Sequence, residues 1–192
     1  VSGTPADSVV LGLDHILVGG ADVVVSGINP GFNTSRNVFI SGTMGAAIQA
    51  AAKGVKACAF SMDVEGDFDD PTVKGVIAAI TTELLSTETE RGALFNVNIP
   101  RFCDTPIEGI EGAAPAPSEL KSLIESHSDG GYEIISGLAV NIDRLELAPG
   151  TDLEVLSRNR IAISSFEGPT LAHQPEDPTL QRMIEAVKRV IG

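Results

Sequence analysis

Short apolar runs alternate with longer segments of helical character over residues 22–100, and this alternation constrains the fold more than any other feature. The runs at 22–27, 55–62 and 93–100 are apolar and bounded by glycine or proline, as buried strands are. Between them, 43–54 is rich in alanine and ends at a glycine, and 71–87 begins with a proline. Strand and helix alternating with short connections predict an α/β fold with a mostly parallel sheet and helices on both faces.

The opening segment and the second half of the chain complete the predicted layout. Helical spacing predicts a helix within 4–17, and an amphipathic stripe predicts another at 177–191. Prolines and glycines interrupt the region that follows residue 100, where we expect loops and one short helix around 118–126. Strands are expected at 132–142, as an arm of a β-rich extension, and at 160–166.

These elements suggest three parts of the chain. We expect an α/β core at 1–100 and a loop with a β-extension at 101–150. The returning strand and C-terminal helix at 151–192 would complete the core or an oligomer interface.

The charge and composition exclude several classes of protein. A net charge of -13 disfavours binding to a nucleic-acid polymer, because phosphate contacts need a basic surface. A small anionic substrate, held with the help of a metal cation, remains compatible with it. No window approaches the ~20 apolar residues of a membrane helix. Cys58 and Cys103 show neither ligand spacing nor a disulfide framework, which favours reduced thiols and a cytoplasmic protein.

The loop between the first strand and the alanine-rich helix contains a candidate anion site. Ser41, Gly42 and Thr43 stand where that helix begins. Unpaired N–H groups and the helix dipole favour an anion there, and a glycine lets a phosphate approach the main chain. The alternative is that Ser41 or Thr43 is only the N-cap of the helix.

Two asparagines of the same loop, Asn29 and Asn33, can also be interpreted in two ways. An amide oxygen is a neutral ligand for a hard divalent cation, and Asn29 follows a buried strand that would fix its position. The alternative is that both are turn residues, since asparagine tolerates left-handed backbone. Mg²⁺ or Mn²⁺ also needs a carboxylate as a rule. The available aspartates lie at the wrong strand end or in a separate loop, namely Asp22, Asp63, Asp67, Asp69 and Asp70.

Four stretches of the chain resemble successive blocks of the SurE family. They read SGTPADSVVLGL, DVVVSGINPGFNTSRNVFISGTMGAAIQAAAKGVKACAFSMD, LFNVNIP and PGTDLEVLSRNRIAISSF. The resemblance implies a Rossmann-like three-layer domain with a small β-rich extension and a C-terminal helix that serves in a homodimer or homotetramer. It further implies a metal-dependent phosphatase that hydrolyses nucleoside 5'(3')-monophosphates, or a broader acid phosphatase.

The resemblance also assigns roles within the loop. Asn29 matches a metal ligand for Mg²⁺ or Mn²⁺, and Asn33, Ser41, Gly42 and Thr43 match phosphate-binding positions. We take Asn29, Ser41 and Thr43 as the catalytic candidates. Nothing in the sequence identifies the general acid that would protonate the leaving alcohol.

The family's two metal-binding aspartates, in an N-D-D-G motif, and a metal-binding serine precede the block at which this chain begins. We therefore expect the first strands and the anionic metal ligands to be missing, and the 192-residue chain alone to be inactive. The alternative function is a non-catalytic module for phosphate binding or oligomerisation.

Overall fold

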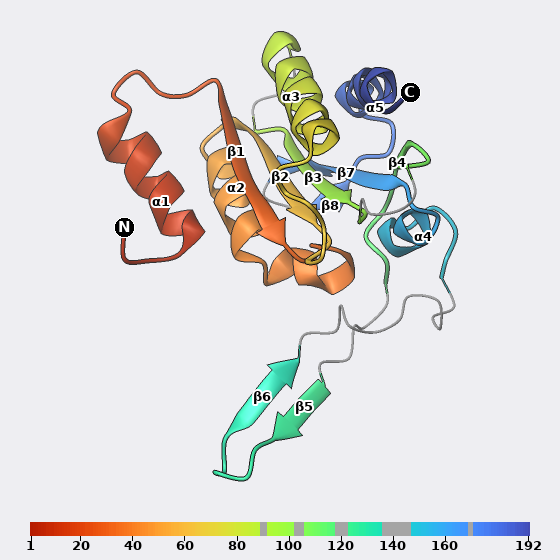
Figure 1. The fold of residues 1–192 in the computed structure, drawn as a ribbon. Helices are drawn as coiled ribbons and strands as arrows, with labels where there is room; N and C mark the ends of the chain where they lie inside the picture. The colour runs from red at the N-terminus through yellow and green to blue at the C-terminus, as the bar shows by residue number, and fades with distance from the viewer. Residues whose placement is uncertain (89–91, 102–105, 118–122, 136–146, 169–170) are drawn as a thin grey trace.

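The computed structural model contains a six-stranded sheet with helices on both faces (Figure 1). Its strands are β1 (Val23–Pro30), β2 (Lys56–Met62), β3 (Leu94–Ile99), β4 (Ile110–Gly112), β7 (Ile161–Glu167) and β8 (Ala172–His173). The strand order is β1-β2-β3-β7-β4, and β8 pairs with β7. The structure describes residues 1–88, 92–101, 106–117, 123–135, 147–168 and 171–192.

The directions of the strands confirm the predicted fold class. β1, β2 and β3 are parallel, β7 is antiparallel to β3, and β4 is parallel to β7. The first strand extends further than predicted, because β1 continues past residue 27 through a register shift between Ser26 and Asn29. Asn29 therefore lies in the last part of the strand, paired with Ser61 of β2, and not in the loop after it.

The helices begin where the sequence offers capping residues. In both α3 (Pro71–Ser86) and α5 (Pro178–Ile191), an aspartate N-cap precedes a proline and accepts a hydrogen bond from the threonine N–H that follows. α1 (Pro5–Leu11) begins with a capping box and continues into a π-helical turn at Gly12–Ile16. The remaining helices are α2 (Gly42–Ala52), α4 (Asp152–Ser157) and a 3₁₀ turn at Ser35–Phe39.

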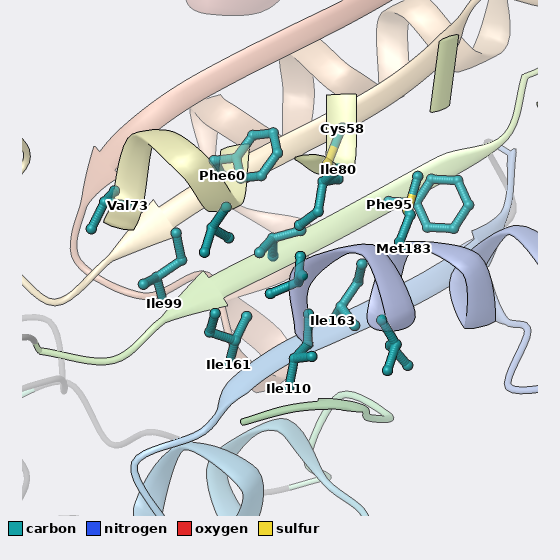
Figure 2. Packing of buried hydrophobic residues seen from close by; sticks show 14 of the residues in the cluster. Cys58, Phe60, Val73, Ile80, Phe95, Ile99, Ile110, Ile161, Ile163 and Met183 are labelled. Atoms are coloured by element: carbon teal, nitrogen blue, oxygen red, sulfur yellow. The ribbon is translucent and has the colours of Figure 1, made fainter. Parts of the chain in front are cut away.

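The larger part of the core lies between the sheet and the pair α3 and α5. Figure 2 shows Phe60 and Phe95 of the strands in one cluster with Ile80 of α3 and Met183 of α5. The predicted C-terminal stripe is confirmed as a core-facing surface, because Leu180, Met183, Ile184 and Val187 are buried in it. No described helix has the combination of length and apolarity needed to span a membrane.

The opposite face of the sheet is covered by α2, with α1 packed on the outside of α2. Alanines make this approach close: Ala47 and Ala50 of α2 pack with Ala57 and Ala59 of β2 in a second buried cluster. The alanine-rich sequence of α2 therefore has a packing reason beyond helix propensity.

The sequence was interpreted wrongly in the β-extension. The helix predicted around 118–126 is wrong over 123–126, which form strand β5 (Leu123–Ser126), antiparallel to β6 (Tyr132–Ile135); its part at 118–122 lies outside the described residues. A short apolar run fits both periods, and here the pairing between strands decides the structure. Of the predicted strand at 132–142, the part at 132–135 is confirmed, and the part at 136–142 lies outside the described residues, as does Cys103.

Candidate active site

A cleft of about 730 Å³ opens beside the carboxyl ends of β1 and β2, the position at which parallel α/β sheets bind ligands. Three segments of the chain line it: the end of β1 with its loop, the start of α2, and the loop after β2. The lining residues are Asn29, Pro30, Gly31, Phe32, Asn33, Asn37, Ile40, Ser41, Gly42, Asp63, Val64 and Glu65.

Asn29 lines this cleft at the end of β1. Its Nδ2 donates to the carbonyl of Gly31 at 2.6 Å, which fixes the amide plane. Among the described residues, none donates a hydrogen bond to Asn29 Oδ1. The backbone before it depends on Gly27, whose φ is +116° and whose added Cβ would lie 2.2 Å from the carbonyl oxygen of Phe60, so only glycine fits.

Asn33 is a buried anchor of the loop, with 4% of its surface exposed. Its Nδ2 donates to Ser61 Oγ at 2.6 Å, and its backbone N–H donates to Asn98 Oδ1 at 2.7 Å. Its carbonyl accepts from Asn96 Nδ2 at 2.8 Å and from Asn98 Nδ2 at 3.1 Å. Three polar side chains of β2 and β3 thus hold the backbone and amide of Asn33 in place.

Sequence reasoning missed Asn96 and Asn98 as part of the site. Both are fully or almost fully buried in β3. A signal was available, because two asparagines two residues apart in a buried strand must face the same side of the sheet and must find partners there.

The start of α2 supports both interpretations of the segment 41–43. Ser41 is the N-cap, and its Oγ accepts from Met44 N at 3.2 Å. The N–H groups of Gly42 and Thr43 have no acceptor among the described residues, as expected for a first helical turn. Ser41 and Gly42 line the cleft, whereas Thr43 is mostly buried behind them. An added Cβ on Gly42 would lie 3.3 Å from Pro5 of α1, so packing also favours a glycine here.

Asp152, at the start of α4, is a second group that the sequence did not reveal. Its carboxylate is completely buried and accepts hydrogen bonds from three backbone N–H groups, those of Ser35, Ala116 and Leu153. Burial raises the pKa of Asp152 to about 6, although the three N–H donors act in the opposite direction. From the sequence, an aspartate after a threonine at the start of a helix is expected to be a capping residue. The neighbouring residues do not indicate that its side chain contacts a loop 117 positions away.

The described residues do not form a complete site for a divalent cation. Asn29 supplies one neutral oxygen, and two acidic residues, Asp63 and Glu65, line the same cleft. The Asp63 carboxylate accepts from Glu65 N at 2.9 Å, and the Glu65 carboxylate pairs with Arg101. Within the part of the chain that the structure describes, no three His, Cys, Asp or Glu side chains lie close enough together to hold a metal. An amide oxygen fits one position of a Mg²⁺ or Mn²⁺ shell and leaves the anionic positions unfilled.

The fold and the cleft together define an α/β protein of the Rossmann-like class, with a helix N-terminus facing the strand ends. The model of the family described as "Survival protein SurE" matches residues 1–121. The chain belongs to the SurE family.

Relatives and a solved structure agree with this assignment. The chain is 41% identical over 176 residues to the 5'-nucleotidase SurE of Flavobacterium johnsoniae, which covers 90% of this chain and 67% of the relative. It is 32% identical over 192 residues to the 5'-nucleotidase SurE of Methylobacterium radiotolerans, covering 97% of this chain and 74% of the relative. The crystal structure of the SurE protein from Aquifex aeolicus shares the fold, with a TM-score of 0.64 at 24% identity over 98% of this chain and 73% of that one.

Proposed function

We propose that the cleft binds the phosphate group of a nucleoside 5'(3')-monophosphate, as part of a metal-dependent phosphomonoesterase. The names of the relatives support the substrate class, since they are 5'-nucleotidases. The observation that carries the proposal is the start of α2, where the N–H groups of Gly42, which lines the cleft, and of Thr43, which follows it, lack acceptors among the described residues. Two N–H groups at the positive end of a helix are suited to phosphate oxygens.

Each predicted site residue then has a distinct role. Gly42 and Thr43 donate their backbone N–H groups to the phosphate, while the Ser41 hydroxyl, engaged as N-cap, keeps those groups oriented. Asn33 keeps the loop against β3 and β2. Asn29 Oδ1 is the proposed ligand of Mg²⁺ or Mn²⁺, whose remaining coordination the described residues do not supply.

A non-catalytic phosphate-binding module is the second candidate. The observation that favours it is the lack of an acidic cluster near Asn29 among the described residues. Both candidates predict phosphate binding, and only the first predicts turnover. A homodimer or homotetramer, and a location in the cytoplasm, are further parts of the proposal; they rest on the resemblance and on the pattern of cysteines.

Binding can be tested with a matched pair of substitutions at Gly42. Gly42→Pro removes one N–H, and proline is well tolerated at the first position of a helix. Gly42→Ala adds a Cβ next to Pro5 but keeps the N–H. A hydrogen bond to a charged group contributes about 1.5–3 kcal/mol, so Gly42→Pro should bind adenosine monophosphate about 10- to 100-fold more weakly than Gly42→Ala in calorimetric titrations. Equal affinities of the two variants would remove Gly42 from the site.

Turnover is tested separately, by phosphate release with Mg²⁺, with Mn²⁺ and with EDTA. We expect none from the 192-residue chain, because among the described residues no three His, Cys, Asp or Glu side chains lie together to complete a metal site with Asn29. A fusion that places an N-D-D-G segment of the family before Val1 should show metal-dependent release that Asn29→Ala abolishes. Binding without release in that fusion would favour the non-catalytic candidate, and a wild-type chain that binds no nucleotide would overturn both.

A further inference from the structure

The Asp152 carboxylate connects three segments that are distant in the sequence. Oδ2 accepts from Ser35 N at 2.7 Å, and Oδ1 accepts from Ala116 N at 2.9 Å and from Leu153 N at 2.8 Å. The side chain is fully buried, so water does not compete for these bonds. Asp152 itself does not line the cleft.

Ser35 depends on this bond for its conformation. Its φ is +53°, which is an unfavourable backbone region for a residue with a side chain. Its hydroxyl is buried and has no hydrogen-bond partner among the described residues. Among the described residues, the hydrogen bond from the Ser35 backbone N–H to Asp152 is therefore the one shown to join Ser35 to a distant segment.

The position of Ser35 is transmitted to the cleft through the 3₁₀ turn that it begins. The carbonyl of Asn37, in this turn, accepts from Ile40 N at 3.2 Å and from Ser41 N at 3.0 Å. Asn37, Ile40 and Ser41 line the cleft, and Ser41 caps α2. A displacement of the turn at Ser35 would thus move the N-cap of α2 and the N–H groups that follow it.

We propose that Asp152 is a positioning residue for the phosphate-binding end of the cleft, acting through Ser35 and the 3₁₀ turn without touching the ligand. This inference rests on the proposed function, since the proposed function states which ligand the positioned groups bind. If Asp152 had only a structural role, replacing it would lower the stability of the protein without a selective effect on the turn or on ligand affinity.

The test is Asp152→Asn. An amide has one acceptor oxygen, so keeping the two bonds of Ala116 and Leu153 turns the NH₂ group toward the N–H of Ser35 and breaks that bond alone. The matched control is Asp177→Asn, at an aspartate that also joins two elements, accepting from Thr179 N at 2.7 Å and Ser165 Oγ at 2.6 Å, outside the cleft lining.

Two readouts separate this inference from the proposed function. Amide hydrogen exchange should become about 10-fold or more faster for Ile40 and Ser41 in Asp152→Asn, with the amides of α5 unchanged. Affinity for adenosine monophosphate should fall by about 10-fold in that variant and stay within about 2-fold in Asp177→Asn. Faster exchange in a protein whose wild type binds no nucleotide would support the positioning and overturn the proposed function.

Three results would overturn the inference. One is unchanged exchange in the turn of Asp152→Asn. Another is an equal loss of affinity in Asp177→Asn. The third needs no variant and applies even if Asp152→Asn does not fold: in the wild type, the Ser35 amide must itself be protected, and fast exchange at Ser35 would show that Asp152 does not hold it.

Discussion

Replacing Asn98 and Asn96 by leucine should give unequal losses of stability, although both are buried asparagines on the same face of β3. Leucine is used because its branched side chain approximates the shape of asparagine and limits the size of any cavity. The two asparagines differ in what they give to Asn33. Asn98 accepts from Asn33 N and donates to its carbonyl, whereas Asn96 only donates to that carbonyl.

The expected losses follow from which group is left without a partner. Asn98→Leu leaves the buried N–H of Asn33 unpaired, while the carbonyl keeps its 2.8 Å bond from Asn96. An unpaired buried donor costs about 1–3 kcal/mol, so we expect a loss of about 2 kcal/mol. Asn96→Leu removes one donor from a carbonyl that keeps Asn98, and it also removes Oδ1 of Asn96, which is buried without a partner among the described residues. The free energy of unfolding should then stay within about 1 kcal/mol of wild type.

Urea unfolding measures both losses, provided that the dependence on urea concentration is the same in all three proteins. Asn98→Leu should also weaken nucleotide binding, since it frees the loop that carries Asn33. A loss for Asn96→Leu that equals or exceeds the loss for Asn98→Leu would refute the claim that Asn98 is the principal anchor of this loop.

Two further predictions concern Asp152 and Lys56. Because burial raises the pKa of Asp152 to about 6, its stabilising contribution is complete below about pH 4, the unfolded value, and is lost as the pH rises through 6. Urea titrations should therefore show that the wild type gains up to about 3 kcal/mol in free energy of unfolding, relative to Asp152→Asn, when the pH is lowered from about 7 to about 4. A difference between the two proteins that stays constant with pH would contradict this. Lys56 Nζ donates to three carbonyls at the end of α3, those of Leu84, Leu85 and Thr87. Lys56→Met should lower the free energy of unfolding in urea by about 1 kcal/mol. The control is Lys74→Met, at an exposed ion pair, which should lower it by less than about 0.5 kcal/mol; equal losses in the two variants would refute the capping role of Lys56.

The parts of the fold that follow a local period could be predicted from the sequence. β2 and α3 lie within a residue or two of their predicted bounds, because Gly54 marks the end of the helix before β2 and Pro71 marks the start of α3. The hairpin of β5 and β6 was missed in part because strand pairing, and not a local period, determines it. The same limit applies to α4, whose six residues are too few for a helical period to stand out.

The candidate site likewise has a part that could be predicted from the sequence and a part that could not. Asn29 and Gly42, which line the cleft, were predicted because they stand at the end of a strand and the start of a helix. The groups that hold the loop in place, Asn98 and Asp152, lie 65 and 117 positions from the residues that they bind. A buried polar side chain indicates that a hydrogen-bond partner exists, but the identity of that partner depends on the tertiary fold.

The charge of the cleft gives an independent reason to expect a cation during phosphate binding. No Lys, Arg or His is among the described residues that line the cleft, whereas Asp63 and Glu65 are. Glu65 is balanced by Arg101, so Asp63 remains as the uncompensated carboxylate on this surface among the described ion pairs. The N–H groups of Gly42 and Thr43 carry only partial charges, which cannot offset both a phosphate dianion and a carboxylate. A divalent cation held at Asn29 would supply the missing positive charge, and a neutral amide at the end of β1 is therefore compatible with the proposed phosphate site in a protein of net charge -13.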